Sequence, residues 1–160
     1  MTKPKGNWQV ETKLWQVALL RIFFGYYFFQ DGLGKLTGGF IRLGVLEKWL
    51  TTKTTEAFSW YRPFPAAVAI PHHQLFAWLI TWGMILVGLA LLLGVLTRPA
   101  ALGGFFMTLN FFLAKGGGSP ATTSDQAFMV GLLVVFLTRA GRSFGFDRWL
   151  ARCYPSSTLW

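Results

Sequence analysis

An uncharged apolar run from Leu75 to Thr97 constrains the fold of this chain more than any other feature. The run is 23 residues long, and a helix needs about 20 apolar residues to cross the hydrocarbon core of a bilayer. A core helix of a soluble protein at this length would carry a polar face, and this run carries none. The run therefore predicts a membrane-crossing helix.

The composition favours lipid as the surrounding solvent. The chain has 160 residues, of which 13% are charged, whereas an average soluble domain has roughly 25%. The net charge is +9, but the basic residues lie between and beyond the apolar runs. We therefore expect them to contact anionic lipid and exclude nucleic acid as a partner. At this length, residues 1–160 are expected to form a single integral membrane domain.

Three further apolar segments predict three more crossings, so that the expected spans are residues 14–33, 75–97, 99–114 and 126–138. In lipid the backbone polar groups must bond within the segment, which favours helices. Between the first two spans, helical spacing relates four apolar residues, Leu43, Leu46, Trp49 and Leu50. This spacing indicates either a helix at the membrane surface or a loop with a helical turn. The predicted fold is all-α: a four-helix transmembrane bundle with a candidate interfacial helix.

Small residues recur on one face of each span. Examples are Ala18, Gly25 and Gly32 in the first span, and Gly83 and Ala90 in the second. Because lipid tails are as apolar as leucine, close backbone approach at small residues drives helix association in membranes. These faces predict close packing without indicating any activity.

The distribution of basic residues predicts the orientation. Arg98 and Arg139, after the second and fourth spans, fall on the same side as the lysines of the N-terminal segment. Excess Lys and Arg mark the cytoplasmic side, so both termini are predicted to be cytoplasmic. The first 13 residues are polar, unlike a signal peptide. The single cysteine, Cys153, allows no internal disulfide or Cys-x-x-Cys pair.

Arg21 is the most costly residue in the predicted bundle, because a charge at membrane depth is unfavourable by about 3 kcal/mol or more. It shares a helix face with Ala18 and Gly25, which indicates that it points inward. It could anchor an anionic or carbonyl ligand such as a quinone. It could equally pair with a carboxylate or snorkel to the headgroups.

Three other polar residues are candidate contacts of a quinone or of a polar core. Asp31 can pair with Lys35 four residues later, or could lie on a proton path. Asn110 is expected to form a hydrogen bond across helices, with a quinone carbonyl as the alternative partner. Asp125, or Ser124 beside it, is expected to cap the fourth helix.

His72 and His73 precede the second span and are candidate ligands of a metal or of a pigment such as haem or chlorophyll. Adjacent residues of a helix point apart, so both cannot face one metal, and the alternative is a solvated loop end. The sequence shows no Ser-His-Asp order, no metal-ligand spacing and no paired carboxylates. It therefore predicts no catalytic residue and encodes no recognisable cofactor motif.

Four stretches together resemble the DoxX/DoxD family: LRIFFGYYFFQDGLGKL, GLALLLGVLTRPAAL, LNFFLA and DQAFMVGLLVVFLTRAGRSFGFDRWL. The family includes the small membrane subunit of thiosulfate:quinone oxidoreductase. The resemblance implies a four-helix fold in a bacterial or archaeal inner membrane, with quinone as ligand and other membrane subunits as partners. Relatives commonly have an acidic residue after the glycine of the second span, whereas Met84 follows Gly83 here.

Two functions are therefore expected. The first is an accessory or structural subunit of a larger redox or energy-transducing membrane complex, which the missing acid at Met84 favours. The alternative is a quinone-linked oxidoreductase subunit that acts on a sulfur compound such as thiosulfate. The sequence leaves open whether the chain is an enzyme.

Overall fold

A computed structural model describes residues 15–117, 120–138 and 145–147 of the chain. All the regular elements of this part of the chain are helices, which confirms the predicted all-α class. The elements are α1 (Trp15–Thr37), α2 (Val45–Lys53), the short π-helix η1 (Pro65–Ala69), α3 (His73–Leu93), α4 (Thr97–Lys115) and α5 (Pro120–Leu137).

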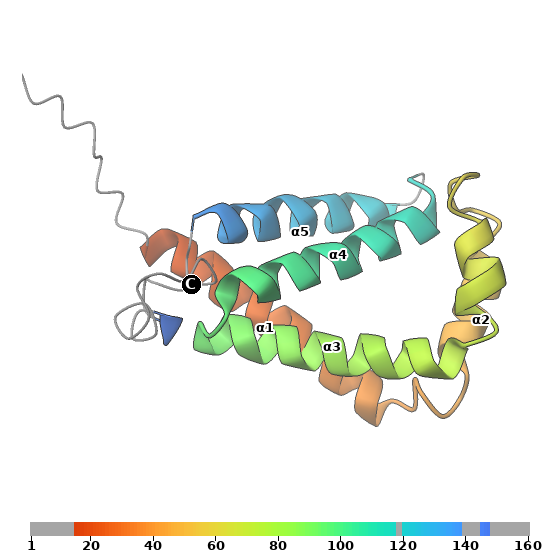
Figure 1. Ribbon diagram of the computed structural model, residues 1–160, viewed down its shortest axis with the longest axis horizontal. Coiled ribbons are helices and arrows are strands. Elements are labelled where there is room, and N and C mark those ends of the chain that lie inside the picture. Colours follow the sequence, from red (N-terminus) through yellow and green to blue (C-terminus); the bar gives the residue numbers. More distant parts are fainter. Residues whose placement is uncertain (1–14, 118–119, 139–144, 148–160) are drawn as a thin grey trace, which may run out of the picture.

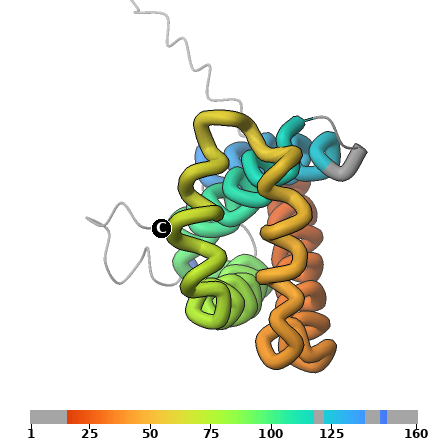
Figure 2. The backbone as a smooth tube through the Cα atoms, turned by 90° about the vertical axis from the view of Figure 1, so that its right-hand side faces the viewer, coloured from red at the N-terminus to blue at the C-terminus, as the bar shows by residue number. Residues whose placement is uncertain are grey.

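The four long helices form a bundle in which successive helices run in opposite directions (Figure 1). The most extensive packing joins α1 to α3 and α4 to α5. α2 and η1 lie across one end of the bundle, where α1 and α4 finish and α3 and α5 begin (Figure 2). We call this the α2 end, and the other, where α3 passes to α4, the turn end.

Glycines bring α1 and α3 into close contact. A Cβ added to Gly25 would lie 2.7 Å from the backbone nitrogen of Leu92, and one added to Gly88 would collide with the backbone of Phe29. Gly25 lies on the predicted face of the first span. The predicted stripe of the second span instead faces α4, since a Cβ on Gly83 would collide with Met107. Gly88 supplies the contact with α1.

Two predicted boundaries on the first and second spans were wrong. α1 continues to Thr37 instead of ending at residue 33, because Gly32 packs against Ile85 of α3 and this contact outweighs the poor helix propensity of glycine. α3 ends at Leu93 instead of Thr97. Gly94, with φ of 67°, takes the left-handed conformation that commonly ends a helix.

The predicted start of the fourth helix was also wrong. α5 begins at Pro120 instead of residue 126, consistent with the preference of proline for the first helical position. Ser124 and Asp125 therefore lie inside the helix, and neither caps it. The third predicted span is close to α4, with Pro99 in the first turn as expected.

The connection between α1 and α3 contains the expected helix, α2. Leu46 and Leu50 are buried in a small core with Ala69 and Ala77. Leu43, which was predicted to share their face, precedes the helix and is exposed. The helical alternative is therefore confirmed over a loop with a single turn.

One described helix, α3, is by itself long and apolar enough to span a membrane. Only 33% of the residues in its most apolar window are buried within the bundle. A core helix of a soluble protein would bury most of such a window. In α5 the stretch Thr122–Leu137 is apolar but shorter.

Candidate binding site

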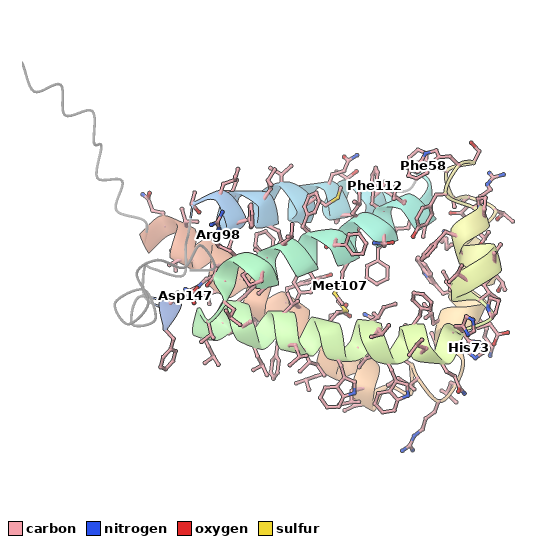
Figure 3. All side chains as sticks on the ribbon, in the orientation of Figure 1. Phe58, His73, Arg98, Met107, Phe112 and Asp147 are labelled. Atoms are coloured by element: carbon pink, nitrogen blue, oxygen red, sulfur yellow. The ribbon has the colours of Figure 1, made fainter. Side chains whose placement is uncertain are left out.

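The turn end holds two buried charged side chains from distant parts of the chain, Arg21 and Asp147. The Arg21 side chain is fully buried and packs against Gly94, where any Cβ would collide with its guanidinium group. Asp147 is close enough to interact electrostatically with Arg21, and Figure 3 shows it at this end of the bundle. Arg21 therefore points inward, as its helix face predicted, toward a carboxylate.

Asp147 also holds the turn between α3 and α4. Its carboxylate accepts hydrogen bonds from the backbone nitrogens of Leu96 at 2.7 Å and Thr97 at 2.9 Å. Its own backbone nitrogen donates to the Gly94 carbonyl at 2.8 Å. A carboxylate at a helix N-terminus satisfies free amide groups and complements the helix dipole. Sequence reasoning missed this role, because the partners lie 50 residues apart.

The α2 end contains a cavity of about 340 Å³ between α1, α2, α4 and α5, which we call the polar cavity. Its charged lining residues are Asp31 and Lys35 from α1, Lys115 from α4 and Asp125 from α5. Its aromatic lining residues are Tyr27, Phe28, Phe40, Trp49, Phe111 and Phe128. The structure thus brings together Asp31 and Asp125, two of the four residues singled out from the sequence.

Each carboxylate of the polar cavity is paired with a lysine. Lys35 Nζ donates to Asp31 Oδ2 at 2.5 Å, and Lys115 Nζ donates to Asp125 Oδ2 at 2.7 Å. An ammonium group has three N–H donors and a carboxylate has about four acceptor sites. Each pair therefore keeps hydrogen-bonding capacity for a ligand in the cavity.

Tyr27 lines the polar cavity together with both aspartates. Because Asp31 and Asp125 line the same cavity, their two ion pairs face one shared space. The ring centroid of Tyr27 lies 4.5 Å from that of Phe128 on α5, within the range of a favourable aromatic contact. The result is a partly open site with charged groups beside flat aromatic surfaces.

Local sequence accounts for one ion pair and the helix hairpin for the other. Asp31 and Lys35 are four residues apart on α1, which places them on one helix face. Lys115 ends α4 and Asp125 lies early in α5, so the turn between these antiparallel helices brings the two together. The role of Lys115 was not predicted from the sequence. A basic residue before a short turn and an acidic residue after it could have indicated this ion pair.

Met84 also lines the polar cavity and is buried. This is the position at which the resemblance implied an acidic residue. Met84 therefore faces the same space as Asp31 and Asp125. In this chain the cavity keeps two carboxylates without an acidic residue at that position.

Asn110 lies in a second, neighbouring cavity of about 260 Å³, which we call the apolar cavity. Tyr61 Oη donates to Asn110 Oδ1 at 2.8 Å, and Asn110 Nδ2 donates to the Phe106 carbonyl at 2.8 Å. Burial raises the pKa of the Tyr61 hydroxyl, which keeps it a neutral donor. Asn110 was predicted to bond to a residue of another helix. Its partner, Tyr61, lies instead in the connection that precedes η1.

The two histidines lie at the start of α3, away from both cavities. His72 is exposed, whereas His73 has Nδ1 3.0 Å from the Ile70 carbonyl oxygen and Nε2 3.6 Å from Glu47 Oε2. Glu47 reaches His73 from α2, which the sequence did not indicate. Among residues 15–117, 120–138 and 145–147, no three His, Cys, Asp or Glu side chains are grouped as metal ligands.

Comparison with known proteins identifies the family. The sequence model of the DoxX family matches residues 16–115, which include Arg21, Asp31, Met84 and Lys115. No curated protein and no solved structure shows significant similarity to the chain. The matched region covers more than half of the sequence and contains α1 to α4. The chain therefore belongs to the DoxX family, whose members are associated with membranes.

Proposed function

We propose that this protein is a four-span membrane subunit of a redox complex and that it binds the headgroup of a quinone in the polar cavity. The observation that carries the proposal is the convergence of two Asp–Lys pairs and a cluster of aromatic rings on one cavity. Small-molecule sites typically combine an apolar lining with a few well-placed polar groups.

The crossing of the membrane by α1, α3, α4 and α5 is supported by length. These helices have 23, 21, 19 and 18 residues, which is about 27–35 Å at 1.5 Å per residue. The hydrocarbon core is about 30 Å thick. The charges of α1 and α4 lie near the turn end (Arg21 and Arg98) or at the α2 end (Asp31, Lys35 and Lys115), and not on the lipid-facing middle.

Outward apolar side chains on each of the four helices support the same arrangement. Leu19 on α1, Leu86 on α3, Phe106 on α4 and Leu137 on α5 are each 58–64% exposed. Such an apolar exterior is costly in water but costs nothing in lipid. An inner membrane of a bacterium or archaeon, with both termini cytoplasmic, fits the family and the basic residues. Reporter fusions at the two termini would test that orientation.

The chemistry of a quinone matches the lining of the polar cavity. A quinone ring presents two carbonyl acceptors and a flat face. The Lys35 and Lys115 ammonium groups can donate to the carbonyls, and Tyr27 and Phe128 can contact the ring. Reduction to the quinol takes up two electrons and two protons. Asp31 and Asp125 can relay the protons, and a partner subunit that oxidises a donor such as a reduced sulfur compound would supply the electrons.

A titration of the purified protein in lipid nanodiscs with a short-chain quinone tests the proposal. The double variant Lys115→Met with Asp125→Asn removes one ion pair without leaving a lone charge. We expect it to bind the quinone at least about tenfold more weakly, a loss of about 1.4 kcal/mol. Lys48→Met, on the exposed face of α2, is the matched control and should bind normally. Equal affinities of the double variant and the control would refute the proposal.

The buried Met84 favours a second candidate, an accessory subunit that organises a redox complex without binding quinone. Its methyl thioether cannot relay protons where the resemblance implied an acid. Gentle solubilisation of the native membrane would test this role through the proteins that co-migrate with the chain. Stable co-migration with redox subunits, together with no quinone binding, would select this second function.

A further inference from the structure

We infer that the apolar cavity binds the hydrocarbon chain of the same ligand whose headgroup lies in the polar cavity. The physiological ligand would then be a long-chain isoprenoid quinone, and its isoprenoid tail would contribute to its recognition by the protein. This inference rests on the proposed function and adds a second binding site to it.

The first argument is that the two cavities adjoin. Leu46 and Trp49 of α2 and Phe111 of α4 line both of them. The rings of Trp49 and Phe111 meet edge to face, with centroids 6.1 Å apart. These shared side chains place the two cavities next to each other, so that a ligand with a headgroup in one has the other beside it.

The second argument is the difference in polarity between the cavities. The apolar cavity has a lining of aliphatic and aromatic side chains, and its one polar pair, Tyr61 and Asn110, is hydrogen-bonded to itself. Asn110 also donates to the Phe106 carbonyl. Such a space offers little to a polar ligand, and water does not fill apolar cavities readily. A hydrocarbon chain can fill this space through apolar contacts with its lining.

The third argument is size. The polar cavity, at about 340 Å³, holds only a small group, near the lower limit of about 300 Å³ for small-molecule sites. The apolar cavity adds about 260 Å³ at the shared wall. Figure 3 shows Met107, one of its lining residues, directed from α4 toward α3. The two cavities together suit a headgroup followed by the first part of a chain.

Filling the apolar cavity tests the inference. Ala69 of η1 and Ala114 of α4 are buried and line the cavity, so Ala69→Leu and Ala114→Leu narrow it from two different elements. Ala67→Leu, at an exposed position of η1, is the matched control. Each protein in nanodiscs is titrated with a short-chain and a long-chain quinone that share one headgroup, and its melting temperature confirms folding.

The wild type and Ala67→Leu should bind the long-chain quinone at least about tenfold more tightly than the short-chain quinone. Ala69→Leu and Ala114→Leu should lose that advantage and keep the short-chain affinity within about twofold. An advantage that survives in both filled variants would overturn the inference while the proposed function stands. Equal competition by a single-chain lipid with an unrelated headgroup would also overturn it, because a membrane lipid would then be the occupant. Failure of the short-chain quinone to bind the wild type would refute the proposed function itself.

Discussion

The two ends of the bundle use charged residues in opposite ways. At the turn end, Arg21 and Asp147 are 0% and 1% exposed, and Asp147 bonds to three backbone groups of the α3–α4 turn. At the α2 end, the four side chains of the two Asp–Lys pairs are 15–40% exposed around a cavity. Enclosed charges that bind the backbone indicate a structural role. Accessible pairs beside a cavity indicate binding.

Energetics sharpen this contrast. Loss of a buried carboxylate typically costs about 1.5–3 kcal/mol for each backbone hydrogen bond that it accepts, and it leaves a neighbouring buried charge less compensated. Exposed or half-exposed pairs contribute only about 0–1 kcal/mol to stability. The turn end should therefore respond to mutation mainly in stability and the α2 end mainly in ligand affinity.

The largest expected effect is that of Asp147→Ala at the turn end. It removes the acceptor of two amide hydrogen bonds, each worth about 1.5–3 kcal/mol when the acceptor is charged, and so the free energy of unfolding should fall by about 3–5 kcal/mol. Denaturant unfolding in detergent measures the change. Asp147→Asn, which keeps one acceptor, should lose less. A quinone affinity that falls while stability is unchanged would reverse the assigned roles of the two ends.

At the α2 end, the double variant Asp31→Asn with Lys35→Met should give the opposite pattern. Short-chain quinone affinity should fall by about tenfold, or about 1.4 kcal/mol, because both polar groups of one pair are lost. The free energy of unfolding should change by less than about 1 kcal/mol. Binding and unfolding are measured on the same preparation, and a large stability loss with normal binding would contradict the prediction.

Tyr61→Phe should have a smaller effect, confined to the apolar cavity. It removes the hydrogen bond to Asn110, and hydrogen bonds between helices in membranes are worth about 0.6 kcal/mol on average. The free energy of unfolding should therefore fall by about 0.6 kcal/mol, which a thermal melt would report as a slightly lower melting temperature. The affinity for the short-chain quinone should stay unchanged. A tenfold loss of that affinity would place the headgroup beside Tyr61 instead of in the polar cavity.

The smallest expected effect is that of Glu47→Gln, which removes the charge 3.6 Å from His73. Both side chains are partly exposed, so the free energy of unfolding should change by about 0.2 kcal/mol, the lower end of the range for exposed pairs. Thr51→Ala, on the exposed side of the same helix, provides a comparison. A much larger loss would show that α2 is held in place by this contact and not by Leu46 and Leu50.

The fold was largely predictable from apolar runs and small residues, whereas the ends of helices were not. Each long helix coincides with an apolar segment of the sequence, because runs of apolar residues and the spacing of small residues can be recognised in a single sequence. The turn at Gly94 could not be located from the sequence. It depends on Leu96, which takes a left-handed conformation with φ of 50°, and no feature of the apolar run indicates that conformation. Asp147, far along the chain, stabilises that turn.

The candidate site was predictable only in part. Asp31 was found because carboxylates near membrane depth are rare and expensive, whereas Asp125 was found as an expected cap of the fourth helix. Their proximity depends on how α1 packs beside α5, which no local pattern encodes. Asn110 was found because a polar side chain at membrane depth needs a hydrogen-bond partner. That partner, Tyr61, lies 49 residues away in a connection. Tertiary packing determines which polar residues share a cavity.

Photolabelling with a reactive quinone tests most directly whether the polar cavity binds the headgroup. The purified protein in nanodiscs would be labelled with a quinone that carries the reactive group on its ring, and the modified peptides identified by mass spectrometry. The label is predicted on lining residues such as Tyr27, Trp49 or Phe128, and it should be lost in the Lys115→Met, Asp125→Asn double variant. Labelling around Arg21 at the turn end, or labelling that the double variant leaves unchanged, would contradict the assignment.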